Sequence, residues 1–230
     1  MRHLLCITLF LVLFAAVQAK GTRNCRIVFL NAPADAPKKL QLFDGKQSQE
    51  VELPRINFSP VYQILPGSIL LKMLSVAETD PEKVSPDAPS VSVPEAVTDF
   101  YLLVSGDPAN LVAPVKLEII DATGFTQGQM LWRNLTANRL DGQIGTEKLA
   151  LHGNSQIILN PPATANEDYN VNISFFKPAS DASQPLCETK WHHDPRVRNV
   201  FFVVSKEGER TPRVMGFRDQ REPVKKAGKR

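Results

Sequence analysis

The sequence has few of the features that mark the common enzyme classes. It contains no Gly-x-Ser-x-Gly elbow, no His-Glu-x-x-His motif, no phosphate-binding loop, no Cys-x-x-Cys pair and no EF-hand loop. Catalytic triads can be scattered along a chain, so these absences do not exclude every enzyme. They favour a non-enzymatic protein for which we expect no catalytic residues and no cofactor.

Long hydrophobic runs are also missing, with one exception at the N-terminus. Arg2 and His3 precede an apolar stretch from Leu4 to Val17, and Ala19 provides a small residue before a cleavage site. This pattern predicts a secretory signal peptide at residues 1–19, too short to be a comfortable transmembrane span. We therefore expect a chain that is exported to the periplasm or the cell surface and is not transmembrane.

The net charge is small, +3 for the whole sequence, which argues against a nucleic-acid-binding body. The charge is nevertheless uneven, because residues 218–230 are strongly basic and lack aromatic side chains. This composition predicts a disordered tail. Its candidate surface-binding residues, for an anionic envelope surface, are Lys225, Lys226, Lys229 and Arg230. The alternative is a solvated chain end without a role.

What the sequence does have is a strong β pattern, densest at residues 124–160. Apolar runs of strand length at residues 129–135 and 157–159 alternate with turn residues, and no helical period is present. The pairs Asp141-Gly142 and Gly153-Asn154 are typical of turns between strands. The segment predicts four short strands of a β-sandwich meander, and the fold class is all-β.

Strand-like runs continue through the chain, about seven before residue 124 and about seven after it, which matches two sandwiches of the usual immunoglobulin-like size. We therefore expect a first domain at residues 20–123, a second at residues 124–217 and the tail at 218–230. Four prolines make residues 78–98 a surface excursion or linker within the first domain. No internal repeat is evident.

Three stretches carry a resemblance to a known group. They are NAPADAPKKLQLFDG (31–45), LPRINFSPVYQILPGSILL (53–71) and QMLWRNLTANRLDGQIGTEKLALHGNSQIIL (129–159). They resemble exported bacterial proteins of unknown function with immunoglobulin-like β-sandwich domains. More loosely, the last stretch resembles periplasmic pilus chaperones, whose basic cleft site and long edge strand do not map onto this sequence. The resemblance implies a location and a fold, with little about activity.

One local cluster has the residue types for chemistry, in the segment from Cys187 to Arg196. A metal site here would use His192 or His193 with Asp194, although adjacent residues of an extended chain point to opposite faces. A Cys187–histidine pair would need an activated thiol and a cleft. The simpler interpretation is a loop packed by Trp191, with no metal and no catalysis.

Cys25 and Cys187 are the only cysteines that remain after removal of the leader. In an oxidising compartment such a pair predicts a disulfide, which here would tie the first domain to the second. The alternative is a pair of buried thiols.

Taken together, the sequence favours a non-enzymatic binding, adhesion or structural module of the cell envelope whose partner is an unknown envelope protein or an anionic surface. The alternatives are an assembly factor or chaperone that pairs with a client strand, and a hydrolase that uses the Trp191–Asp194 region.

Overall fold

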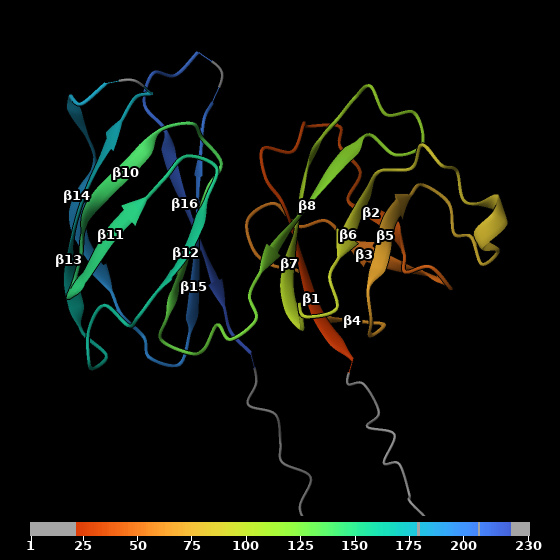
Figure 1. Ribbon diagram of the computed structural model, residues 1–230, viewed down its shortest axis with the longest axis horizontal. Coiled ribbons are helices and arrows are strands. Elements are labelled where there is room, and N and C mark those ends of the chain that lie inside the picture. Colours follow the sequence, from red (N-terminus) through yellow and green to blue (C-terminus); the bar gives the residue numbers. More distant parts are fainter. Residues whose placement is uncertain (1–21, 179, 207, 222–230) are drawn as a thin grey trace, which may run out of the picture.

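The computed structural model describes residues 22–178, 180–206 and 208–221. The predicted signal peptide at residues 1–19 and the candidates Lys225, Lys226, Lys229 and Arg230 lie outside these described residues. Within the described part, no helix is long and apolar enough to cross a membrane. Almost all regular structure is β, which confirms the predicted all-β class (Figure 1).

The first eight strands form one sandwich of two four-stranded sheets. Sheet I has the order β3-β2-β5-β6, and sheet II has the order β4-β1-β7-β8. The strands are β1 (Arg23–Phe29), β2 (Lys39–Phe43), β3 (Ser48–Glu52), β4 (Tyr62–Ile64), β5 (Ile69–Leu74), β6 (Ser90–Val93), β7 (Asp99–Gly106) and β8 (Val115–Asp121). A short 3₁₀ turn, η1 (Pro81–Lys83), precedes β6.

The last eight strands form a second sandwich. Sheet III has the order β12-β9-β15-β16, and sheet IV has the order β11-β10-β13-β14. The strands are β9 (Met130–Asn134), β10 (Arg139–Ile144), β11 (Glu147–Leu151), β12 (Gln156–Leu159), β13 (Asp168–Phe176), β14 (Ser183–His192), β15 (Arg198–Val204) and β16 (Arg213–Asp219).

The two sandwiches have the same topology, with every strand number offset by eight. In each, the first strand pairs in parallel with the seventh, β1 with β7 and β9 with β15. The sequence showed no repeat, because the likeness lies in strand order rather than in residue identity. Each sandwich has eight strands rather than the seven expected, and its immunoglobulin-like character stays a prediction.

Three apolar cores separate four layers of sheet, in the order I, II, III, IV (Figure 1). Alternate residues of β7 show how this arises: Phe100 and Leu102 face the core of the first sandwich, whereas Tyr101 and Leu103 face the second domain. Sheet III contributes Val200, Phe202 and Val204 to that same interdomain core. Strands buried on both faces read as continuous apolar runs, which is why β1, β7 and β15 lack the usual alternation.

Several local expectations were wrong. The segment at residues 78–98, expected as a surface excursion or linker, is partly regular, because it provides β6 and packs Val84 and Ala88 against Phe43 and Leu74. Asp141-Gly142 is not a turn but lies inside β10. The four strands of residues 124–160 are not a simple meander, since β9 pairs with β12 while β10 and β11 form a hairpin in the opposite sheet.

The predicted Cys25–Cys187 disulfide is also contradicted, because both thiols are free. Cys25 lies within β1 and is buried in the core of the first sandwich. Cys187 lies within β14, where it packs against the core of the second sandwich. The two thiols therefore face different cores, which are separated by sheets II and III, and the domains are not joined by this disulfide.

A labelling experiment checks the free thiols. We expect native protein to be alkylated at the half-buried Cys187 and not at Cys25, which reacts only after unfolding, because burial removes access and raises the pKa of its thiol. Mass spectrometry of non-reduced protein measures both sites. Denatured protein in which neither cysteine can be alkylated without a reductant would contradict the structure.

Candidate functional site at the domain interface

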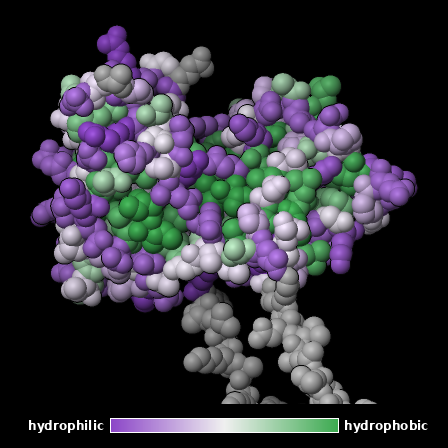
Figure 2. Space-filling view, in the orientation of Figure 1, coloured by the Kyte–Doolittle hydropathy of each residue, from purple (hydrophilic) through white to green (hydrophobic). Residues whose placement is uncertain are grey.

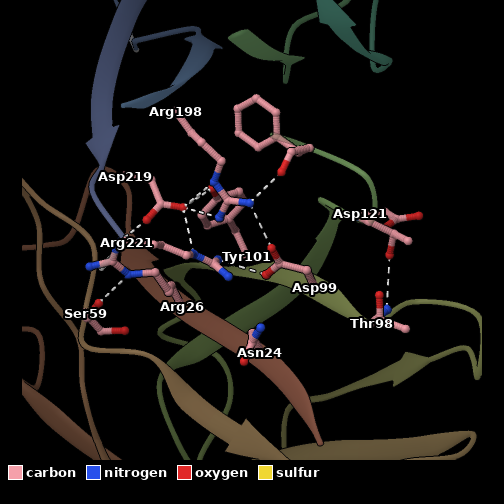
Figure 3. A network of polar contacts seen from close by, with 12 residues as sticks. Asn24, Arg26, Ser59, Thr98, Asp99, Tyr101, Asp121, Arg198, Asp219 and Arg221 are labelled. Carbon is pink, nitrogen blue, oxygen red and sulfur yellow. Dashed lines mark hydrogen bonds and ion pairs between the residues drawn. The ribbon is translucent and has the colours of Figure 1, made fainter. Parts of the chain in front are cut away.

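The second domain is fixed to the first by a cluster of charged side chains at one end of the interdomain core (Figure 3). Asp219, the last residue of β16, accepts hydrogen bonds from Tyr101 on β7 (oxygen–oxygen distance 2.5 Å) and from Nε of Arg198 at the start of β15 (3.0 Å). Arg198 also donates to Asp99 Oδ2 (2.9 Å) and to the Phe125 carbonyl (2.8 Å). One guanidinium thus bonds to both domains and to the segment that connects them.

Two further arginines complete this cluster. Arg26 on β1 donates to Asp219 and, through Nε, to the Ser59 carbonyl at 2.7 Å. Arg221 pairs with Asp99 (2.8 Å) and Asp219 (3.2 Å). We call the six side chains the interface cluster: Arg26, Asp99, Tyr101, Arg198, Asp219 and Arg221.

Electrostatics keep the Asp219 carboxylate ionised despite its burial. Burial acts to raise the pKa of Asp219, but the guanidinium of Arg198, the Tyr101 hydroxyl and Arg221 outweigh it and hold the pKa below its usual range. Burial and the Asp219 carboxylate raise the pKa of Tyr101 well above its usual value, so the phenol stays a donor. These carboxylates are engaged by several donors each, which suits them to hold the domains together rather than to transfer protons.

At the opposite end of the same interdomain core, the two domains border a cleft of about 450 Å³. Its apolar walls come from Leu30 and Leu103 of the first domain and from Leu135 and Val204 of the second. Its polar groups include Asn31, Ser105, Glu118 and Ser205. Figure 2 shows apolar residues exposed around the junction of the two domains, within a mostly hydrophilic surface.

An interdomain ion pair borders this cleft. Arg133 on β9 donates from Nε (2.9 Å) and Nη2 (2.6 Å) to Oε1 of Glu118 on β8. The cleft is therefore bounded by contacts that hold the domains in one arrangement: the Arg133–Glu118 pair beside it and the interface cluster at the far end of the core. A preformed cleft between rigidly joined domains is a common site for ligands.

The three candidate metal ligands, His192, His193 and Asp194, have different surroundings in the structure. His192 is exposed, with Nδ1 2.7 Å from Asp168 Oδ1 and Nε2 2.6 Å from Asn166 Oδ1. His193 points the other way and is only 1% exposed. Asp194 pairs with Arg196 and Arg218 instead. In the part of the chain that the structure describes, no group of three or more His, Cys, Asp or Glu side chains is arranged to hold a metal ion.

The surroundings of this segment also differ from the predicted loop. Trp191 lies in β14 and stacks on Phe201 with ring centroids 4.9 Å apart, and Phe201 stacks in turn on the fully buried Trp132. Cys187 and Trp191 both pack against the second core. Burial raises the pKa of the Cys187 thiol, which is the opposite of what an activated nucleophile needs.

His193 is a buried imidazole whose two ring nitrogens have no hydrogen-bond partner among the described residues. Burial lowers its pKa, although the nearby Asp194 and Glu167 act in the other direction. In the unfolded chain a histidine takes up its proton at about pH 6.5, and the folded chain does so only at lower pH. Below about pH 6.5 the unfolded state therefore binds more protons, and stability falls as the pH is lowered.

Replacement of this imidazole tests that reasoning. We expect His193→Phe to reduce the loss of unfolding free energy between pH 7 and pH 5, because the variant has no buried base to protonate at this position. Urea denaturation at a series of pH values measures the effect. A variant with the same acid dependence as the wild type would show that His193 is not the group responsible.

Sequence reasoning missed the interface cluster and the cleft. Asp219 and Arg218 were assigned to the disordered tail, whereas both belong to β16. The only local signal was that β7 and β15 both begin with a charged residue, Asp99 and Arg198, directly before an apolar run. No protein-family model matches the chain, and no curated protein sequence is significantly similar to it.

Proposed function

We propose that the chain is an exported, non-enzymatic binding module of the cell envelope that holds its partner in the cleft between the two sandwiches. The observation that carries this proposal is the cleft itself, which has walls from both domains and an apolar floor continuous with the interdomain core. The interface cluster supports it, because domains fixed by buried contacts spend no binding free energy on closure.

The lining of the cleft indicates what the partner presents. The apolar floor of Leu103, Leu135 and Val204 fits an apolar side chain, and Ser105 and Ser205 can exchange hydrogen bonds with the adjoining backbone. Glu118 is already neutralised by Arg133, so the cleft does not select for a charged group. The partner we propose is an envelope protein that inserts an apolar side chain from an extended segment.

The hydrolase alternative has less support. The Trp191–Asp194 region does not assemble a nucleophile, a base and a cleft, because His192, His193 and Asp194 face different surroundings. The chaperone alternative retains one supporting feature, the open edge of β14 in sheet IV. Export, the surface-binding role of the tail and the resemblance to exported sandwich proteins remain parts of this proposal.

A variant that fills the cleft tests the proposal. Ser205→Trp places an indole in the cleft, whereas Ser92→Trp places the same side chain on an exposed position of β6, far from the interface. We expect tagged wild-type protein and Ser92→Trp to capture the same envelope component, identified by mass spectrometry, and Ser205→Trp to lose it. Thermal unfolding confirms that both variants fold. Equal capture by all three proteins would contradict a cleft site.

A further inference from the structure

Strand β14 is the longest strand in the described structure, with ten residues from Ser183 to His192. It lies at the edge of sheet IV, where β13 is its only strand partner among the described residues. A long open edge presents a row of backbone donors and acceptors that another strand can pair with. Exposed edges of this kind serve as contact surfaces in proteins that add a strand from a partner.

The side chains of this edge carry a short charge pattern. Glu188 and Lys190 are both exposed and flank Thr189. Their neighbours across the ladder on β13 are the neutral Asn172 and Asn170, and neither charge has an ion-pair partner within the described residues. Because they are two residues apart in a strand, both side chains point to the same face of the sheet.

This pattern is complementary to itself when two copies of the strand run antiparallel. With the two-fold axis at Thr189, Glu188 of one copy lies opposite Lys190 of the other, and the second pair is formed by symmetry. A shift of the axis to residue 188 opposes two glutamates, and a shift to residue 190 opposes two lysines. Opposite charges directly across a ladder are favourable and like charges are unfavourable, so the register centred on Thr189 is favoured over these two neighbouring ones.

The limits of the strand agree with this register. The β13–β14 ladder is irregular between Ile173 and Ser174, where Cys187 and Pro185 are their partners, so Leu186 is the extra residue of a bulge. Pro185, just beyond the bulge, has no N–H to donate to a second strand. With the axis at Thr189, Leu186 pairs with His192 of the second copy, and His192 is the last residue of β14. The paired segment therefore runs from Leu186, at the bulge, to His192, at the end of β14.

We propose that two copies of this chain associate through antiparallel pairing of their β14 strands, centred on Thr189, so that the two copies of sheet IV form one continuous sheet. Isologous contacts of this kind close after two subunits, which gives a dimer rather than a filament. The surface lies on the outer layer of the second domain and is separate from the cleft between sheets II and III. The inference therefore goes beyond the proposed binding function and does not depend on it.

Charge reversal provides the main test, with sedimentation equilibrium of the mature chain over a wide concentration range. We expect Glu188→Lys and Lys190→Glu each to raise the dissociation constant of the dimer at least tenfold, because each variant opposes like charges. The double variant restores opposite charges and is expected to dimerise as the wild type does. An equimolar mixture of the two single variants is expected to form a mixed dimer, which shows that both are folded.

Two results overturn the proposal. One is a wild-type chain that stays monomeric at the highest concentration, which leaves the β14 edge to a client strand. The other is a dimer whose dissociation constant is the same in the single variants, the double variant and the wild type. Ser205→Trp is expected to dimerise normally, so failure of the cleft proposal and failure of this one give different results.

Cross-linking tests the register directly. Residues directly opposite in an antiparallel pair have Cα atoms about 4.5–5.5 Å apart, which is within the range of a disulfide. In a Cys187→Ser background, we expect Thr189→Cys to form a disulfide-linked dimer under mild oxidation. Ser183→Cys, at the start of β14 and outside the paired segment, is expected to remain unlinked. Equal cross-linking of both variants, or none of either, contradicts the register centred on Thr189.

Discussion

Replacement of Asp219 with alanine is expected to lower the free energy of unfolding by about 3–5 kcal/mol, because it removes one partner from a buried ion pair. The carboxylate is fully buried and accepts hydrogen bonds from Tyr101 and Arg198. Without it, the Arg198 guanidinium keeps Asp99 and the Phe125 carbonyl but has lost its charge partner in the second domain. The remaining positive charge is then desolvated without full compensation.

Urea denaturation of the purified chain measures this loss, and an exposed ion pair provides the control. Glu209 pairs with Arg213 at the surface, where solvent screens the interaction, so Glu209→Ala is expected to leave the unfolding midpoint unchanged. A separate transition for each domain in Asp219→Ala would show that the cluster also couples the two sandwiches. Equal stability of the two variants would contradict the role assigned to the buried cluster.

The same substitution changes the response to acid. Because the pKa of Asp219 is lowered in the folded chain, its contribution is present above the pKa of an unfolded aspartate and is lost as the pH falls through the folded value. Asp219→Ala has no such contribution to lose. Its stability deficit relative to the wild type is therefore expected to shrink as the pH is lowered from 7 into the acid range, which denaturation at each pH measures.

The fold class could be predicted from the sequence because strands have recognisable local sequence patterns. Apolar runs such as those of β7 and β15 are strand-length and β-rich, and turn residues separate them. Their lack of alternation carries further information about the layers of the fold. A strand with apolar residues on both faces must be covered on both, so the runs at residues 100–104 and 200–204 indicate sheets that lie between two layers.

The interface cluster could not be read in this way. Arg26 and Asp219 are 193 positions apart, and Tyr101 and Asp219 are 118 apart, so no local pattern links them. The basic composition of residues 218–230 led to the wrong prediction that Asp219 belongs to a disordered tail, whereas it lies in β16. Pairing within sheet III places Arg198 of β15 opposite Asp219 of β16, but only the packing of sheet II on sheet III brings the start of β7 to them. The cleft has the same origin and was missed for the same reason.

Gly142 shows how the composition of a turn can occur inside a strand. Asp141-Gly142 has the composition of a hairpin turn, yet Gly142 lies within β10 and pairs with Leu149 on one side and Ile173 on the other. A Cβ atom on Gly142 would lie 2.2 Å from the Asn172 carbonyl oxygen and 2.8 Å from the Ile173 Cα. Glycine is required because the backbones of β10 and β13 approach too closely for any side chain.

We therefore expect Gly142→Ala to destabilise the second sandwich by at least the ~1–3 kcal/mol that overpacking usually costs, because backbone rather than a side chain must move.

Gly216→Ala is the matched control: Gly216 also lies in a strand of the second domain, but its Cβ would meet only the Phe201 ring, at 3.0 Å. The Phe201 ring is stacked on Trp132 and Trp191, but the edge of a side chain yields more easily than backbone, and alanine restricts the unfolded chain, so the control is expected to cost less than Gly142→Ala. Urea denaturation of both variants decides the point. If the two are equally stable, the close approach of β10 and β13 is not the reason for the glycine. If Gly142→Ala alone is destabilised, a strand pairing rather than a turn explains its presence in the sequence.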